Sequence, residues 1–179
     1  MHVGSFPTSE LSQTQLAEIR ALCDAAWTVT DESFDDDDWR SAQGGVHFIL
    51  SEQGRMVSHA SVVGRVLELD GRPLGTGYVE AVATLPERQG HGLGTRVVRD
   101  VTAFIDRTYE LGALNTGVAP FYERLGWRRW QARTGVRTAE GLQLTPCEDG
   151  RVFVRYPGAV PPIGAESLLT CDWRPGEVW

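Results

Sequence analysis

The hydrophobic pattern begins with an amphipathic helix and continues with apolar runs of strand type. From Ser12 to Trp27 apolar residues recur at helical spacing, and Ser12 followed by Gln15 fits a capping box, so we expect the first helix to start at Ser12. Residues 46–85 hold three apolar runs, separated by a turn around Gly54 and by Asp70-Gly71, a strong hairpin signal. These runs predict an antiparallel meander of three strands.

The remaining elements follow from shorter patterns. Residues 1–10 are expected to be an extended entry strand or arm. The acids of 35–39 suit the first turn of a short helix, and the acidic loop that holds them is either a solvated, charged turn or a cation-binding rim. The later elements are expected to be a helix over Gly94–Thr108, a strand over Leu111–Thr116, a short helix over Ala119–Leu125 ended by Gly126, and strands over Trp127–Arg137 and Arg151–Tyr156. Leucine and tryptophan in the segment after Pro157 predict that it packs back on the domain.

The stretch from Tyr78 to Thr95 carries the clearest chemical signal. An apolar strand with one carboxylate, Glu80, runs into a loop with glycines at 90, 92 and 94 and then into a helix. Bare backbone N–H groups at a helix N-terminus are suited to a pyrophosphate. A dinucleotide fold would place its loop after the first strand of an alternating series, whereas three strands precede this one. A Walker loop needs a lysine, and this chain has none.

Composition narrows the class of protein. With 179 residues and 41% hydrophobic residues the chain is long enough for one domain over residues 1–179. A net charge of −7 disfavours nucleic acid and favours cationic partners. Three widely spaced cysteines indicate reduced thiols, and no signal peptide or membrane span is evident, so a cytoplasmic location without membrane association is expected. Four scattered histidines argue against a metal site; those within strands, His47 and His59, are expected to be packed, satisfied residues.

The order of elements and two motifs resemble the GCN5-related N-acetyltransferase (GNAT) superfamily. The first motif is Gln89-Gly90-His91-Gly92-Leu93-Gly94, and the second is the segment from Ala119 to Trp127 that contains Tyr122. The resemblance implies an α/β (α+β) fold with a central mixed, mostly antiparallel sheet of about seven strands flanked by helices. It also implies that acetyl-CoA is the cosubstrate. The implied cofactor-binding residues are Val82, Ala83, Thr84, Gln89, Gly90, His91, Gly92, Leu93, Gly94 and Thr95.

The distance along this strand fits the same cosubstrate. From Glu80 to Leu85 an extended strand covers roughly 16 Å, at about 3.3 Å per residue. That length is on the order of an extended pantetheine arm. A thioester anchored by its pyrophosphate near Gln89–Gly94 would therefore end close to Glu80.

A closer resemblance, over nearly the whole chain, is to the aminoglycoside 2′-N-acetyltransferases. The segments that carry it are Asp38-Trp39, Gly44–His47, Gly77–Glu80, Tyr109–Leu114, Tyr122 with Gly126-Trp127, Asp149-Gly150 with Val152-Phe153, and the C-terminal Cys171–Arg174 with Gly176–Trp179. The resemblance implies a polycationic aminoglycoside or related amine as substrate, a homodimer, and a tail, residues 158–179, that packs on the substrate cleft. The implied substrate positions are Ser33, Asp38, Glu80, Ala81, Asn115, Glu148, Glu177 and the carboxylate of Trp179.

Two departures from the family pattern bear on the range of substrates. The family usually has Asp where this chain has Ser33, and the segment from Leu114 to Tyr122 is about two residues shorter than usual. Neighbouring acids, Asp31, Glu32, Asp35 and Asp36, offer replacement charge.

The chemistry of N-acetylation assigns a role to two residues. An ammonium group must lose a proton before it attacks a thioester, and Glu80, ionised at neutral pH with a reference pKa of about 4.3, is the candidate base, acting through water where the amine is remote. Tyr122, with a reference pKa of about 10, is the candidate acid for the departing sulfur, a role that the resemblance implies and that spacing alone would not. Without a catalytic role, Glu80 would be a strand-edge carboxylate that faces solvent, and Tyr122 would be a packing aromatic on a short helix. No acyl-enzyme is implied, because no cysteine has a neighbouring histidine in the sequence.

Three functions remain open from the sequence. The first is acetylation of the 2′-amine of an aminoglycoside. The second is a GNAT acetyltransferase for another small-molecule amine, such as a polyamine, or for a peptide N-terminus. The third is a non-catalytic binder of acetyl-CoA or aminoglycoside, against which the presence of Glu80, Tyr122 and the complete glycine loop speaks.

Overall fold

The computed structural model describes residues 2–28 and 34–179, which form two compact units. The first unit comprises Met1–Val63 and Val79–Phe104, and the second comprises Gly64–Tyr78 and Ile105–Trp179. Strand β3 (Arg55–Leu69), strand β4 (Arg72–Thr84) and helix α3 (Leu93–Thr108) each have residues in both units. Ser33, an expected substrate residue, lies outside the described residues.

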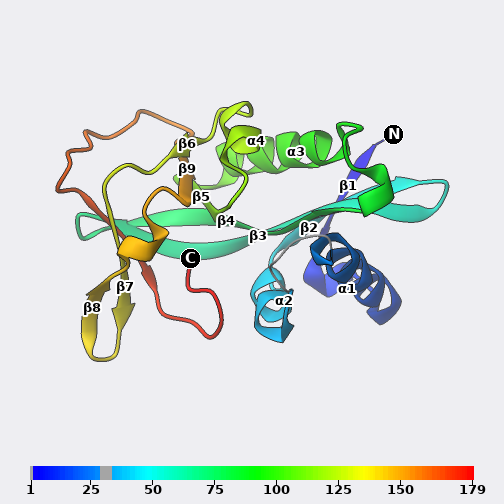
Figure 1. The fold of residues 1–179 in the computed structure, drawn as a ribbon, viewed down its shortest axis with the longest axis horizontal. Coiled ribbons are helices and arrows are strands. Elements are labelled where there is room, and N and C mark those ends of the chain that lie inside the picture. Colours follow the sequence, from blue (N-terminus) through cyan, green and yellow to red (C-terminus); the bar gives the residue numbers. More distant parts are fainter. Residues whose placement is uncertain (1, 29–33) are drawn as a thin grey trace. The chain divides into compact units, whose positions relative to one another are not determined.

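The first unit contains the expected meander and its helices. Its further elements are β1 (Val3–Pro7), η1 (Thr8–Glu10), α1 (Gln13–Trp27), α2 (Asp36–Ala42), β2 (Val46–Glu52) and η2 (Pro86–Arg88). Strand β2 pairs antiparallel with both β1 and β3. Within this unit α1 and α2 lie on one side of the strands and α3 on the other (Figure 1). Contacts support this layering, since Phe48 of β2 packs on Phe104 of α3 and Glu18 of α1 accepts the N–H of Met56.

Both helices at the start of the chain begin with a capping box. The hydroxyl of Ser12 accepts the N–H of Gln15, whose side chain in turn binds the N–H of Ser12. In α2, Asp35 is the N-cap, and Asp38 completes the same reciprocal arrangement. Each capping box satisfies N–H groups that have no partner inside the helix. The predicted starts at Ser12 and in the tract 35–39 are confirmed.

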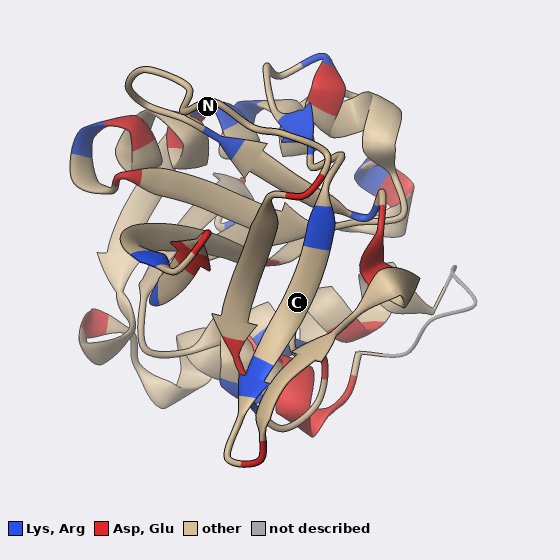
Figure 2. Ribbon diagram, turned by 90° about the vertical axis from the view of Figure 1, so that its left-hand side faces the viewer, with Lys and Arg blue, Asp and Glu red and all other residues tan. Residues whose placement is uncertain are grey.

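The second unit holds the strands of the C-terminal half. Its elements are β5 (Leu111–Asn115), α4 (Ala119–Glu123), β6 (Arg128–Arg129), β7 (Arg133–Thr138), β8 (Gly141–Leu144), η3 (Pro146–Glu148), β9 (Val152–Arg155) and β10 (Leu168–Asp172). Together with the parts of β3 and β4 that belong to this unit, its strands pair in the order β6-β9-β5-β4-β3-β10-β7-β8. Basic and acidic positions stand close together along these strands (Figure 2), as in the ion pairs of Arg137 with Glu68 and Asp172.

The described residues form ten strands, where about seven were expected. The segment predicted as one strand, Trp127–Arg137, is two short strands, β6 and β7, with Trp130 between them. Strands β8 and β10 were not predicted. Strand β10 pairs in parallel with β7 and antiparallel with β3, so it depends on partners far away in the sequence.

Parallel pairing between β4 and β5 is short. It joins Thr76, Gly77 and Tyr78 to Leu111, Gly112 and Ala113, whereas β4 continues to Thr84 and β5 to Asn115.

At Gly77 a Cβ atom would stand 2.7 Å from the ring of Tyr109 and 2.9 Å from Ile105. Glycine at this position therefore allows the end of α3 to pack directly on the strand.

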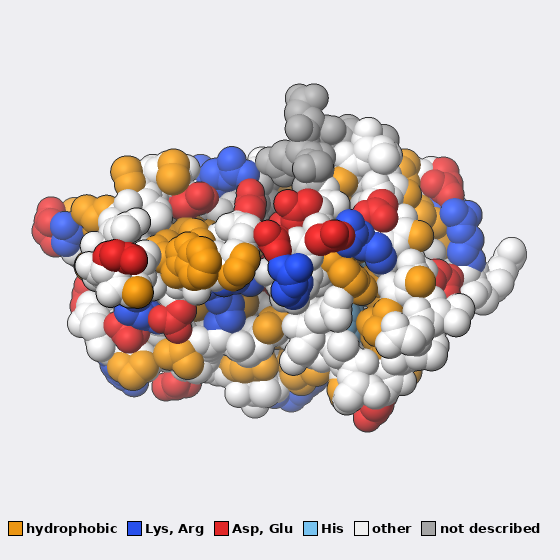
Figure 3. Space-filling view, turned by 90° about the horizontal axis from the view of Figure 1, so that it is seen from below, with side chains coloured by type: hydrophobic (Ala, Val, Ile, Leu, Met, Phe, Trp, Pro, Cys, Tyr) orange, Lys and Arg blue, Asp and Glu red, His pale blue; other side chains and the backbone are white. Residues whose placement is uncertain are grey.

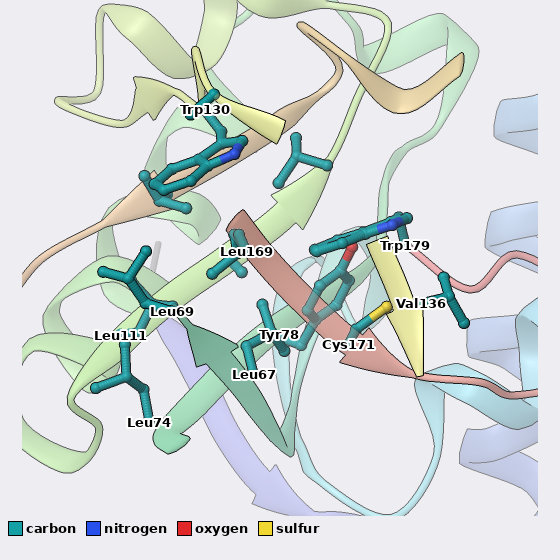
Figure 4. Close-up of a cluster of buried hydrophobic side chains, with 14 residues drawn as sticks. Leu67, Leu69, Leu74, Tyr78, Leu111, Trp130, Val136, Leu169, Cys171 and Trp179 are labelled. Atoms are coloured by element: carbon teal, nitrogen blue, oxygen red, sulfur yellow. The ribbon is translucent and has the colours of Figure 1, made fainter. Parts of the chain in front are cut away.

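The core of the second unit includes the C-terminal residues. Trp179, Cys171 and Leu169 are buried among Tyr78, Trp130 and the apolar residues of β3, β5, β7 and β9. Figure 4 shows the indole of Trp179 beside the phenol of Tyr78, with the Cys171 sulfur nearby. Burial of one large apolar side chain contributes about 1.5–3 kcal/mol to the free energy of unfolding.

No helix among the described residues is long and apolar enough to cross a membrane.

Candidate active site

The end of β4 is held by polar side chains of β3. Three β3 side chains, all fully buried, lie within hydrogen-bond distance of β4 carbonyl oxygens. The pairs, β3 residue first, are Ser58 and Ala83 at 3.0 Å, His59 and Ala81 at 2.9 Å, and Ser61 and Glu80 at 3.4 Å. Ala81 has φ of 49°, a left-handed conformation that a residue with a Cβ adopts at a cost of about 1–2 kcal/mol. The strand is thus bent beside Glu80, and its carbonyl groups are fixed there.

Two buried histidines form a hydrogen-bonded pair behind this bend. The Nδ1 atom of His47 lies 2.9 Å from Nε2 of His59, and Nε2 of His47 lies 2.9 Å from the hydroxyl of Thr8. Both imidazoles are fully buried. Burial lowers the pKa of His47 to about 4, and burial together with the neighbouring His47 lowers the pKa of His59 to about 3. Both rings are neutral at physiological pH, and the expectation that they are packed, satisfied residues is confirmed.

The glycine loop has the backbone that a phosphate-binding turn requires. Gly90 and Gly92 have φ of 75° and 76°, which glycine adopts without steric cost. Arg96 donates the first helical hydrogen bond, to the carbonyl of Gly92 at 3.2 Å, so the N–H groups of Leu93, Gly94 and Thr95 stand at the N-terminal end of α3. A Cβ at either glycine would meet nothing within 4 Å, and both residues are exposed. The residues present fit a diphosphate group.

Carboxylates in the acidic tract at the start of α2 already cap the helix or form ion pairs. A carboxylate oxygen of Asp38, an expected substrate residue, accepts the N–H of Asp35 at 2.9 Å. Asp36 and Asp37 form ion pairs with Arg20 and Arg40. Figure 3 shows acidic side chains gathered next to basic ones on one face. The negative charge of this tract is therefore partly neutralised by arginines.

Tyr122 sits on α4 in the second unit and is buried. The turn is closed by Gly126, which has φ of 84°, and the N–H of Trp127 donates to the carbonyl of Tyr122 at 3.1 Å. Aromatic rings of Phe121, Trp127 and Phe153 pack around the phenol ring. Burial raises the pKa of Tyr122 well above its ordinary value, so its hydroxyl keeps its proton at any physiological pH.

Two expected substrate residues of the second unit are brought together. The amide nitrogen of Asn115, at the end of β5, donates to a carboxylate oxygen of Glu148 at 2.6 Å. The N–H of Glu148 donates to the carbonyl of Thr145, whose hydroxyl accepts the indole N–H of Trp179 at 3.1 Å. Asn115, Glu148 and Trp179 are therefore linked through Thr145, although they are widely spaced in the sequence.

The C-terminal residues are fixed by arginines that the sequence did not single out. Arg65 of β3 donates to the carbonyl oxygens of Asp172 and Val178, and its guanidinium lies 4.6 Å from the ring centre of Tyr78. Arg174 donates to the carbonyl of Glu177 at 2.7 Å. The side chain of Glu177 is exposed and that of Trp179 is buried, so the predicted role of Trp179 concerns its terminal carboxylate alone.

The cysteines are not arranged for nucleophilic catalysis or metal binding. Burial raises the pKa of Cys23 to about 12 and also raises the pKa of Cys171, which suppresses the thiolate. Cys147 is exposed. Within residues 2–28 and 34–179 no three His, Cys, Asp or Glu side chains are grouped as metal ligands.

Comparison with known proteins shows which family the chain belongs to. A family model of the GNAT acetyltransferase domain matches residues 8–130. The chain is 36% identical over 178 residues to the aminoglycoside 2′-N-acetyltransferase of Mycolicibacterium fortuitum, covering 96% of this chain and 89% of that relative. The chain therefore belongs to the aminoglycoside 2′-N-acetyltransferase family, within the GNAT acetyltransferases. The two resemblances seen in the sequence are confirmed.

Solved structures show the same fold. A GNAT family acetyltransferase from Brucella melitensis, solved in complex with acetyl-CoA, has a TM-score of 0.61 at 19% identity, covering 91% of this chain and 93% of that one. A GCN5-related N-acetyltransferase from Kribbella flavida has a TM-score of 0.58 at 18% identity; 74% of this chain is covered, and the match spans 34% of that longer chain. The chain thus has the GNAT-type α/β fold, a mixed sheet flanked by helices.

Proposed function

We propose that the chain transfers the acetyl group of acetyl-CoA to the 2′-amino group of aminoglycoside antibiotics and so confers resistance to them. Membership in the aminoglycoside 2′-N-acetyltransferase family, over nearly the whole chain, carries this proposal. The second support is chemical. The residues expected to bind a polycation include Asp38, Glu80, Glu148 and Glu177, all carboxylates.

The chain's own residues supply the cosubstrate site in this proposal. Backbone groups of Val82, Ala83 and Thr84 would bind the pantetheine arm, and the loop from Gln89 through Gly94 to Thr95 would bind the pyrophosphate. Gly90 and Gly92, exposed and left-handed just before α3, support the second assignment. When bound, acetyl-CoA supplies an activated acetyl thioester.

Glu80 would prepare the amine for attack. Its carboxylate is partly buried on β4, next to the bend at Ala81. An ionised carboxylate both attracts an ammonium group and accepts its proton, directly or through one water. The neutral amine then attacks the thioester carbonyl, and the C–N bond forms as the C–S bond breaks. The nitrogen loses a second proton as the amide forms; that proton neutralises the departing thiolate through water, and the first passes from Glu80 to solvent.

Tyr122 would stabilise the leaving sulfur. Its raised pKa means that the phenol is protonated whenever substrate arrives. A thiol has an ordinary pKa of about 8.5, so complete transfer of a phenolic proton to the thiolate is unfavourable in this buried setting. Tyr122 therefore acts chiefly by donating a hydrogen bond to the developing thiolate, which is an electrostatic contribution.

An assay of CoA release tests this proposal. Turnover is expected with tobramycin or gentamicin C, which carry a 2′-amine, and not with amikacin, which carries a 2′-hydroxyl. NMR of the acetylated product should place the new amide at the 2′ position. Turnover of both classes, or of neither, would rule out the 2′-amine assignment and favour another GNAT amine substrate.

Single variants test the two roles. Glu80→Gln and Tyr122→Phe should each lower kcat by on the order of 100-fold or more, the usual contribution of acid–base residues. Tyr156→Phe is the matched control, because its phenol is also partly buried and its hydroxyl makes no hydrogen bond to the described part of the chain. The assignments fail if Glu80→Gln and Tyr122→Phe leave kcat at the level of this control.

A further inference from the structure

The buried histidines form a hydrogen-bond chain whose direction the geometry settles. A carbonyl oxygen only accepts, so Nδ1 of His59, 2.9 Å from the Ala81 oxygen, carries the proton. In a neutral ring Nε2 of His59 then accepts, and Nδ1 of His47 donates to it. Nε2 of His47 is left as an acceptor for the hydroxyl of Thr8.

The surroundings of Thr8 agree with this direction. Its hydroxyl has one proton and lies 2.9 Å from His47 and 3.1 Å from the carbonyl of Gly45. That carbonyl already accepts the backbone N–H of Thr8 at 2.9 Å. The hydroxyl in turn accepts the N–H of Gly44. The hydroxyl can donate its proton to either acceptor. The Gly45 carbonyl is satisfied without it, whereas Nε2 of His47 has no other donor among the described residues. With the proton on the side of His47, every donor in the chain points from Thr8 towards Ala81.

We propose that His59, backed by His47 and Thr8, is a positioning residue that fixes the bend of β4 at Ala81 and thereby orients the Glu80 carboxylate. The chain ends on a carbonyl oxygen, which cannot pass a proton onward, so it is not a proton relay. Its effect is to hold the backbone at Ala81 in one conformation. A buried network of this kind holds one backbone arrangement because any other leaves polar groups unsatisfied.

The left-handed conformation of Ala81 is the reason why this part of β4 has to be held in place. A non-glycine residue at φ of 49° relaxes unless its surroundings hold it. Four elements contribute to the hold: η1 through Thr8, β2 through His47, β3 through His59, and β4 through Ala81. Glu80 and Val82 flank Ala81, so rotation of this residue would turn both away from their present directions.

A matched pair of variants separates positioning from packing. The amide nitrogen of Asn reaches the place of Nδ1, so His59→Asn keeps the donor for Ala81 and loses the bond to His47. His59→Gln reaches the place of Nε2, so it keeps the partner of His47 and loses the donor for Ala81. With an aminoglycoside substrate, His59→Gln should lower kcat by on the order of 100-fold, as small misplacements at a reacting centre do. KM for acetyl-CoA should rise by a smaller factor, because Val82 is the one pantetheine residue next to Ala81. His59→Asn should lose much less, because the donor for Ala81 remains and only the support from His47 and Thr8 is gone.

A second measurement does not depend on the proposed function, on which the kinetic test rests. Nitrogen-15 NMR of the imidazoles should show both histidines as neutral Nδ1–H tautomers, and the amide signals of residues 80–82 should move in His59→Gln and not in His59→Asn. Opposite tautomers, or equal effects of the two variants on these amides, would overturn the inference. Failure of the wild type to acetylate any aminoglycoside would refute the proposed function and leave this test intact. Equal losses of kcat in both variants would overturn the positioning role.

Discussion

Arg65 donates a hydrogen bond of 2.9 Å to the carbonyl oxygen of Val178, a residue 113 positions away and next to the C-terminus. The same guanidinium nitrogen donates to Asp172, and its carbon lies over the ring of Tyr78. Glu177 and the terminal carboxylate, both expected from the family resemblance to bind substrate, flank the residue that Arg65 holds. The position of these acids therefore depends on a basic residue of β3.

Replacement of Arg65 by Leu should release this tail. Hydrogen bonds from a charged donor contribute about 1.5–3 kcal/mol, so the free energy of unfolding should fall by about that amount. KM for the aminoglycoside should rise, and carboxypeptidase should remove the last residues faster. Arg72→Leu is the control, because that side chain is 76% exposed and its ion pair with Glu110 spans 4.0 Å; such pairs contribute about 0–1 kcal/mol. Equal effects of the two variants on KM would contradict the account.

The hydrogen bond between Asn115 and Glu148 leads to a prediction about substrate charge. Glu148→Gln should raise KM for the aminoglycoside several-fold and weaken the rise of KM with added KCl, because one carboxylate no longer attracts the cation. Asn115→Ala should raise KM less, since the charge remains and only its orientation is lost. Glu140→Gln removes an exposed charge in the β7–β8 turn and serves as the control. An unchanged salt dependence in Glu148→Gln would remove Glu148 from the substrate site.

Local signals explain how much of the fold was predictable. The capping box at Ser12, the acids of 35–39 and the turn at Asp70-Gly71 act within a few residues, and the structure has a helix start or a turn at each. Strand β10 depends on parallel pairing with β7, in which each residue pairs with one 35 positions earlier, as Leu168 with Arg133. No local pattern reports such pairing.

The residues of the candidate site also divide into those that a local pattern reveals and those that depend on distant contacts. Motif residues such as Tyr122 and the loop glycines could be named from the sequence. The roles of His59 and Arg65 could not, because each depends on which carbonyl oxygen lies opposite the side chain. Two polar residues inside apolar strand runs, His47 and His59, were the available signal. Their linkage requires the register that brings His47 opposite Ser61 and His59 opposite Ile49.

Acid should destabilise the protein through the buried histidines. Their pKa values are about 4 and 3 in the folded chain, against an ordinary 6.5 when unfolded, so the unfolded state binds more protons below pH 6.5. The free energy of unfolding should be constant above that pH and fall as pH drops towards 4. The slope should approach about 1.4 kcal/mol per pH unit for each histidine. Urea titrations from pH 4.5 to 7.5 measure it.

A double variant isolates the histidine contribution. His47→Gln combined with His59→Asn removes both titrating groups and leaves every carboxylate in place. Its stability should be lower at pH 7.5 but should decline less steeply with acid than that of the wild type. If both proteins showed the same slope, the acid sensitivity would come from carboxylates rather than from the buried histidines.

Substitution of Gly92 by Ala should weaken the cosubstrate site without a steric clash. A Cβ there would meet nothing within 4 Å, so the effect comes only from φ of 76°, which costs an alanine about 1–2 kcal/mol. If the loop relaxes to escape that cost, the N–H groups at the start of α3 turn away and KM for acetyl-CoA rises by about 10-fold, the equivalent of 1.4 kcal/mol. Gly158→Ala, also in open space and without a positive φ, should leave KM unchanged. Isothermal titration with CoA, with and without the aminoglycoside, measures the binding directly; equal affinity in the two variants would mean that the conformation of Gly92 plays no part in holding the pyrophosphate.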